Sequence, residues 1–244
     1  MCGAGVAYDG GDAEDGKGIN QITEKGILLC DHGRKRNPGK GSIPRAVFSY
    51  GNDAVETVSY DPEEAKKLLE ESGWTDTDGD GYVDKDGQKL TINWLTYPTR
   101  LEQPKLAEYA QATLKEIGID VSVNNTSDHR TYAENGEFDV YVSSLTTAPT
   151  GDPEYFFSST VTGSKNYGNY QNDEVTKLTE QLHQTFDTDE RGKLAVELQQ
   201  KILDDDAYFF VSHLNMGIVT KANVTGMAAH PCDYYEITAD LDVQ

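Results

Sequence analysis

Cysteine is scarce in this chain of 244 residues, and its three copies lie far apart. Cys2, Cys30 and Cys232 show neither the paired spacing of a zinc site nor the density of a disulfide framework. Long apolar runs are also lacking: no stretch approaches the roughly 18 residues of a membrane span, and residues 1–19 lack the basic start and apolar core of a signal peptide. We therefore expect neither a membrane helix nor an export signal within this sequence.

Basic residues are few: 21 Lys and Arg stand against 42 Asp and Glu, which gives a formal net charge of -21. Such a balance argues against nucleic acid or an anionic membrane surface as partner. It would suit a cationic ligand, although acidic side chains spread over a chain usually form a solvated surface. No Gly-x-Ser-x-Gly elbow, glycine-rich phosphate loop or HExxH motif is present, so an enzyme is not predicted.

Strand and helix patterns alternate along most of the chain. Runs rich in β-branched and aromatic residues predict strands at residues 90–97, 119–124, 138–145, 208–214 and 217–221. Apolar residues at helical spacing predict helices over residues 101–117 and 172–186, and a third helix from Asp187 to the acidic residues 204–206. Strands separated by helices indicate an α/β fold with crossover connections.

Residues 60–74, YDPEEAKKLLEESGW, predict one further, well-capped helix. Asp61 suits the N-cap, Pro62 the first helical position, and Gly73 the left-handed residue that closes the last turn.

The acidic turn after this helix matches the first half of a calcium-binding loop. Asp76, Asp78, Asp80 and Asp84 stand at ligand spacing, with glycine at the sixth position. The twelfth position holds Gly87 where a bidentate glutamate is expected. The alternative is a hairpin-like turn in which aspartates accept hydrogen bonds from nearby amides.

The tyrosine, the DPEEA helix, its Gly-Trp end and the DGDG turn together resemble the opening of the C-terminal lobe of the family 5 extracellular solute-binding proteins. Those proteins capture peptides or nickel for ABC importers. The resemblance implies one lobe of a type II periplasmic-binding-protein-like fold, a mixed sheet flanked by helices. It divides the chain into a leader or partly disordered remnant of the first lobe and crossover (residues 1–41), a ligand-binding lobe (42–225) and a segment that returns toward the first lobe (226–244).

The resemblance places the ligand near an acid-proline pair, Asp152-Pro153, and the aromatic Tyr155. Peptide-binding members carry an aspartate just ahead of this pair for the ligand's ammonium group, and this chain has none there. Ala148-Pro149 instead resembles the turn of nickel-binding members, which points to Pro149 and Asp152 as contacts.

Nickel-binding members tend to have a histidine in the loop that follows, where this chain has Tyr167 and Tyr170. Imidazole suits nickel. Of the histidines at 129, 183, 213 and 230, His230 is the strongest candidate, because Cys232 and Asp233 stand close to it in the sequence. The alternative is that His230 and Cys232 belong to a structural loop.

The resemblance thus predicts an extracytoplasmic, non-enzymatic and monomeric solute-binding fragment, either periplasmic or a cell-surface lipoprotein. Its partner is the ABC permease, and its transported ligand is nickel or a nickel chelate; the alternative ligand is an oligopeptide or dipeptide. No cofactor is required. A third hypothesis is a calcium-binding module at residues 76–84. Cys2-Gly3-Ala4-Gly5 resembles the mature start of lipoproteins in this family.

Overall fold

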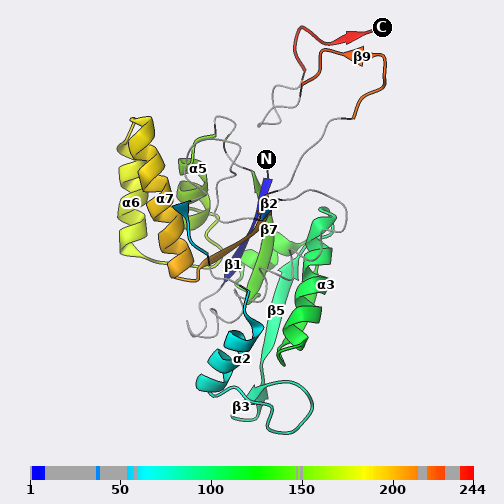
Figure 1. Ribbon diagram of the computed structural model, residues 1–244, viewed down its shortest axis with the longest axis vertical. Helices are drawn as coiled ribbons and strands as arrows, with labels where there is room; N and C mark the ends of the chain where they lie inside the picture. The colour runs from blue at the N-terminus through cyan, green and yellow to red at the C-terminus, as the bar shows by residue number, and fades with distance from the viewer. Residues whose placement is uncertain are drawn as a thin grey trace.

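The centre of the molecule is a six-stranded mixed sheet with helices on both faces (Figure 1). The computed structural model describes residues 2–8, 37–38, 54–57, 60–146, 148, 151–213, 219–228 and 237–244. The strand order is β2-β8-β1-β7-β5-β6. The strands are β1 (Cys2–Tyr8), β2 (Asn37–Pro38), β5 (Thr91–Thr96), β6 (Asp120–Asn125), β7 (Val140–Thr146) and β8 (Tyr208–His213). The predicted α/β class and mixed sheet are confirmed.

Strands β5, β6 and β7 run parallel to one another, with Trp94 opposite both Val123 and Val140. On the other side of β7, the antiparallel strand β1 lies between β7 and β8, and β2 adds to the outer edge of β8. Because β5 and β7 are parallel, their carboxyl ends meet at the same edge of the sheet. In open α/β sheets this edge is where ligands bind.

Strand β1 lies within residues 1–41, the segment predicted as a leader or partly disordered remnant of the first lobe and crossover. Cys2–Tyr8 pair along their whole length with β7 and, with one register shift, with β8. Glycine weakens a strand, and Gly3 and Gly5 both lie in this one. Pairing on both sides supplies backbone partners that an isolated strand would lack. Most of residues 9–41 lie outside the described part of the chain.

Six α-helices surround this sheet in the described part of the chain. They are α2 (Pro62–Glu71), α3 (Glu102–Lys115), α4 (His129–Glu134), α5 (Glu154–Phe156), α6 (Asp173–Gln184) and α7 (Thr188–Asp204). Helix α5 runs directly into a π-helical turn, η2 (Phe157–Val161).

The predicted helix caps are present. Asp61 accepts a hydrogen bond from the amide of Glu64 at 3.0 Å, and Gly73 has a φ of 87°. Asn172 and Asp187 cap α6 and α7 in the same way, because each accepts amide hydrogen bonds from the first turn of its helix. These local signals explain why the helix boundaries agree with those expected from the sequence.

Alternate residues of the strands serve two separate hydrophobic layers. Trp94, Val142 and Phe209 pack with α2 and α3 on one face. On the opposite face, β5 and β7 pack against α4 in one cluster, while Tyr208 and Phe210 pack against α5, η2, α6 and α7 in another. This second face therefore carries two separate groups of helices, one over β5 and one over β8.

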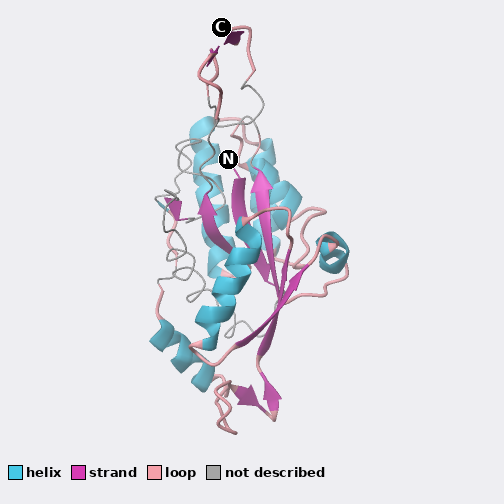
Figure 2. Cartoon of the chain, turned by 90° about the vertical axis from the view of Figure 1, so that its right-hand side faces the viewer, coloured by secondary structure: helices cyan, strands magenta, loops and turns pink. Residues whose placement is uncertain are grey.

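Two small two-stranded antiparallel sheets extend from opposite ends of this body (Figures 1 and 2). One is formed by β3 (Asp84–Lys85) and β4 (Gln88–Lys89), the other by β9 (Val224–Thr225) and β10 (Asp242–Val243). The prediction of a strand at residues 217–221 is wrong for residues 219–221, the part that the structure describes, because these residues are not in a strand. The side chain of Val219 is 97% exposed, so it is not part of a packed strand. That residues 226–244 return toward a first lobe stays a prediction.

None of the helices formed by the described residues combines the length and the apolar character needed to cross a membrane.

Candidate functional site

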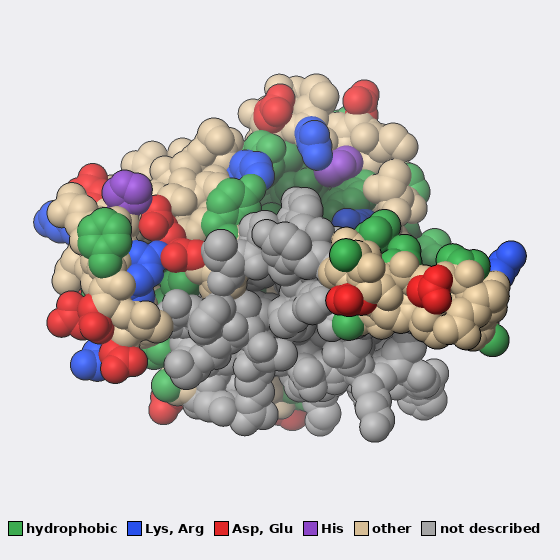
Figure 3. All heavy atoms as spheres, turned by 90° about the horizontal axis from the view of Figure 1, so that it is seen from above, with side chains coloured by type: hydrophobic (Ala, Val, Ile, Leu, Met, Phe, Trp, Pro, Cys, Tyr) green, Lys and Arg blue, Asp and Glu red, His purple; other side chains and the backbone are tan. Residues whose placement is uncertain are grey.

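A cavity of about 600 Å³ lies on the second face of the sheet, near the carboxyl ends of β5 and β7. Its walls come from the residues after β5, from α4, from β7 and β8, and from the end of η2 with the loop that follows it. Seen from above in Figure 3, this region is hollowed, with Lys, Arg and His side chains beside apolar ones. The volume and the position are those of a small-molecule site.

Aromatic rings form one side of the cavity. Tyr97 stacks on His129, with ring centroids 4.1 Å apart and an interplanar angle of 21°. Tyr141 lies 5.8 Å from His129, and Tyr167 meets Tyr141 edge-on at 5.9 Å. Rings from the residue after β5, from α4, from β7 and from the loop after η2 thus hold one another in place.

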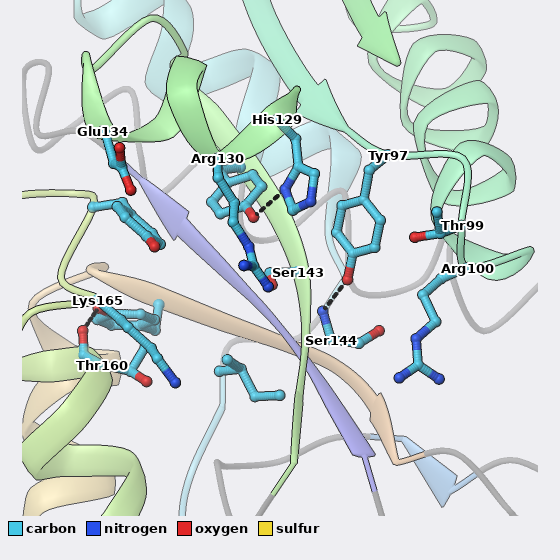
Figure 4. Close-up of a pocket in the computed structure, with 14 residues that line it drawn as sticks. Tyr97, Thr99, Arg100, His129, Arg130, Glu134, Ser143, Ser144, Thr160 and Lys165 are labelled. Carbon is cyan, nitrogen blue, oxygen red and sulfur yellow. Dashed lines mark hydrogen bonds between the residues drawn. The ribbon is translucent and has the colours of Figure 1, made fainter. Parts of the chain in front are cut away.

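Hydrogen bonds fix three of these rings (Figure 4). The amide of Ser144 donates to the Tyr97 hydroxyl at 3.1 Å, and His129 Nδ1 lies 2.6 Å from the Tyr141 hydroxyl. Burial raises the pKa of Tyr141 to about 12, so its hydroxyl stays protonated. Burial, with the charge of Arg130 nearby, lowers the pKa of His129 below 6.5. The cavity therefore holds a neutral imidazole at pH 7.

This state of His129 predicts a pH dependence. Because its pKa is lower in the folded protein than in the unfolded chain, the neutral form contributes stability that is complete above pH 6.5 and declines as the pH falls below that value. An NMR titration of the His129 ring, assigned with a His129→Gln variant, should give a pKa below 6.5. A pKa at or above 6.5 would show that burial does not govern this ring.

Charged side chains reach the cavity from three segments (Figure 4). Arg100 follows β5, Arg130 is the second residue of α4, and Lys165 follows η2. Glu134, at the end of α4, is the acid among the lining residues. The whole chain has twice as many acidic as basic residues, whereas basic side chains outnumber acidic ones among the residues that line the cavity.

Gly163 brings the chain back to the cavity after η2. A Cβ atom at this position would clash with the carbonyl oxygen of Ser158, so glycine allows the close approach. The Lys165 amide then donates to the carbonyl of Ser159 at 2.9 Å. The fold of this turn places Lys165 and Tyr167 opposite α4.

The structure distributes the residues predicted from the acid-proline motif over several places. Tyr167 lines the cavity. Asp152, Tyr155 and Tyr170 are not among the cavity's lining residues, although the Tyr155 hydroxyl contacts Lys165 Nζ at 3.3 Å. Pro149 and His230 lie outside the described residues, as do Cys30 and Cys232.

Asp152 forms an ion pair within the fold. Both of its carboxylate oxygens accept hydrogen bonds from Arg191 Nη2 at 2.6 Å, and Oδ1 also accepts the amide of Glu154 at 2.8 Å. Arg191 is only 9% exposed and donates through Nη1 to the carbonyls of Leu182 and Thr185. The acid-proline pair thus ties the start of α5 to α6 and α7.

Tyr170 has a similar structural role. Its hydroxyl donates to Asp205 Oδ2 at 2.5 Å, and its ring packs edge-on against Tyr208. Burial, reinforced by the Asp205 carboxylate, raises the pKa of Tyr170. The contact joins the loop before α6 to the end of α7.

The two histidines whose side chains are described lie in different environments. His129 lies in the cavity, whereas His183 is an exposed residue of α6 that contacts Glu154 at 2.6 Å. The side chain of His213 is not described. Sequence reasoning missed Arg100, Arg130, Glu134 and Tyr141 as lining residues. Arg100 could have been found from its position just beyond the carboxyl end of a predicted strand, because ligands bind at that edge of a parallel sheet.

The acidic turn forms a network of local hydrogen bonds. Asp76 accepts the amides of Gly79 and Gly81, and Asp84 accepts both the amide and the hydroxyl of Thr77. Asp80 pairs with Lys89 at 2.7 Å. Ligand atoms of Asp76, Asp78 and Asp84 lie within 4.8 Å of one another. This is the pattern expected of a hairpin-like turn, and calcium here stays a prediction without support.

Comparisons with known proteins agree with this architecture. A family model described as "Bacterial extracellular solute-binding proteins, family 5 Middle" matches residues 32–168. The oligopeptide-binding protein AppA of Bacillus subtilis (strain 168) is 32% identical over 205 residues, which cover 80% of this chain and 38% of AppA. The nickel-binding periplasmic protein of Escherichia coli (strain K12) is 28% identical over 191 residues, covering 75% of this chain and 36% of that protein.

Solved structures show the same fold. Bacillus subtilis AppA in complex with a nonapeptide gives a TM-score of 0.79 at 24% identity, covering 96% of this chain and 49% of AppA. NikA from Brucella suis in complex with Fe(III)-EDTA gives a TM-score of 0.80 at 21% identity, covering 100% of this chain and 51% of NikA. This chain thus spans about half or less of these relatives, and the predicted type II periplasmic-binding-protein fold is confirmed. The family match over more than half of its length shows that the chain belongs to the family 5 bacterial extracellular solute-binding proteins.

Proposed function

We propose that this chain is a ligand-binding lobe of the solute-binding component of an ABC importer, and that its cavity holds part of a short peptide. The cavity itself carries the proposal, since it combines aromatic walls, three cationic side chains and one acid near the carboxyl ends of β5 and β7. Arg100, Arg130 and Lys165 suit the carboxylates of a peptide, and Glu134 suits its ammonium group. The similarity to AppA, an oligopeptide-binding protein, supports this choice.

In this proposal the protein works outside the cytoplasm and as a monomer. The ligand is enclosed when a second lobe closes over the cavity, and the closed form docks on the permease. Arg100, Arg130 and Lys165, which line the cavity, are exposed side chains and so would be accessible to such a lobe and its ligand. Glu134 supplies an acid that the neighbourhood of Asp152 lacks, so the missing aspartate no longer argues against a peptide with a free amine.

A nickel chelate is the second candidate, and His129 favours it. In the tautomer with a proton on Nδ1, that N–H donates to the Tyr141 hydroxyl and leaves the Nε2 lone pair for a metal. Histidines that bind metals are oriented by such a bond on the other ring nitrogen. Arg100 and Arg130 would then hold carboxylates of the chelator.

A two-dimensional NMR titration of this 244-residue chain separates the candidates. Trialanine at millimolar concentration should shift the amides of Tyr97, Ser143 and Ser144, and a Ser143→Trp variant that fills the cavity should abolish those shifts. Nickel with L-histidine is the parallel ligand, with His129→Gln as its control. Changes caused by nickel-histidine alone would make the chelate the leading ligand. The absence of changes at the cavity with either ligand would overturn the proposed site.

A further inference from the structure

We infer that this cavity selects ligands in which carboxylates outnumber ammonium groups, so that acidic short peptides bind in preference to neutral peptides of the same shape. The inference rests on the proposed function and specifies its class of ligand. It follows from the charges and hydrogen-bond donors that face the cavity.

The cationic side chains are the first observation. The described part of the chain contains three arginines, and Arg191 is held by Asp152. The other two, Arg100 and Arg130, both line the cavity, and neither forms an ion pair with another described residue. In a chain of net charge -21, two arginines that converge on one cavity and have no acidic partner among the described residues are suited to an anionic ligand.

Lys165 adds a third positive charge from the opposite side. Its Nζ lies 3.3 Å from the Tyr155 hydroxyl and 5.5 Å from the centre of that ring. Both are contacts with a neutral group, and Lys165 forms no ion pair with any residue that the structure describes. Figure 4 shows Lys165 and Arg100 reaching into the region of the cavity from different sides. A ligand with carboxylates at both ends would meet positive charge at each.

The hydrogen-bond direction at Tyr97 is the second, independent observation. A backbone amide can only donate, so the Ser144 N–H makes the Tyr97 oxygen an acceptor. The hydroxyl proton of Tyr97 is therefore left to donate elsewhere, although this side chain is only 7% exposed. Tyr97 lines the cavity, so its hydroxyl proton can donate a hydrogen bond to a bound ligand.

Ser144 does not compete for this donor. Its hydroxyl accepts from Gln103 Nε2 at 2.8 Å and donates to Glu102 Oε1 at 3.4 Å. The Tyr141 hydroxyl is used within the protein, because it contacts both His129 Nδ1 and the Ser143 side chain. The cavity thus offers donors and cations in excess, and Glu134 is its acid.

The test compares two peptides that differ in charge alone, Ala-Glu-Glu and Ala-Gln-Gln, by NMR titration of the 244-residue chain. Two added carboxylates at partly exposed cations should make Ala-Glu-Glu bind about five- to tenfold more tightly. The Arg100→Gln/Arg130→Gln double variant should remove this preference. A Lys177→Gln/Lys193→Gln double variant, which neutralises two exposed lysines of α6 and α7, carries the same net charge and should keep it.

The outcomes distinguish this inference from the proposed function. Equal binding of both peptides at the cavity, or tighter binding of Ala-Gln-Gln, would overturn the charge preference and leave peptide binding intact. Equal loss of preference in both double variants would assign it to the overall charge and also overturn the inference. Binding of neither peptide would overturn the proposed function together with it.

Discussion

Replacing Phe157 with alanine is expected to lower the free energy of unfolding by about 3–5 kcal/mol. Phe157 is fully buried in the hydrophobic cluster that α5, α6, α7 and β8 form on the second face of the sheet. Its ring meets Phe156 edge-on, with ring centroids 5.4 Å apart. The substitution removes a large buried ring and leaves a space that α6, α7 and β8 cannot fully close. Urea unfolding followed by circular dichroism measures the loss.

Phe186 provides a matched control, because the same substitution there removes a ring that is 90% exposed. Phe186→Ala should change the free energy of unfolding by no more than about 0.5 kcal/mol. Similar losses at the two positions would mean that the packing of η2 against α6 and α7 is not as the structure shows.

Arg191→Met is expected to cost about 3–5 kcal/mol, because it removes the buried guanidinium group that pairs with the Asp152 carboxylate. The guanidinium group joins Asp152 to the carbonyls of Leu182 and Thr185, so the substitution breaks links among α5, α6 and α7 at once. The same unfolding experiment gives the value.

Lys193→Met is the control for Arg191. This lysine is exposed on the same helix and forms no ion pair with a described residue, so its loss should have an effect within about 0.5 kcal/mol. If Arg191→Met were as mild as this control, the ion pair with Asp152 would not contribute to stability.

The secondary structure could be predicted from the sequence because its signals are local. Asp61, Asn172 and Asp187 each cap a helix within three residues of their own position. Strand β1 could not be predicted in this way, because its order depends on pairing with β7 and β8, which lie more than 130 residues away.

The site was harder to predict for the same reason. The acid-proline motif identified a segment near the cavity, and Tyr167 lines it. The partner of Asp152, however, is Arg191, 39 residues further along the chain, and no local pattern indicates that contact. Arg100, Arg130 and Lys165 become neighbours only when the sheet brings the end of β5, the start of α4 and the turn after η2 together.

The central claim is that the cavity at the carboxyl ends of β5 and β7 binds the solute. The trialanine titration tests it most directly when intermolecular NOEs locate the bound peptide. We expect NOEs from the alanine methyl groups to the ring protons of Tyr97, Tyr141 and Tyr167. NOEs confined to residues outside the cavity, or no NOEs at saturating peptide, would contradict the assignment of this face as the ligand site.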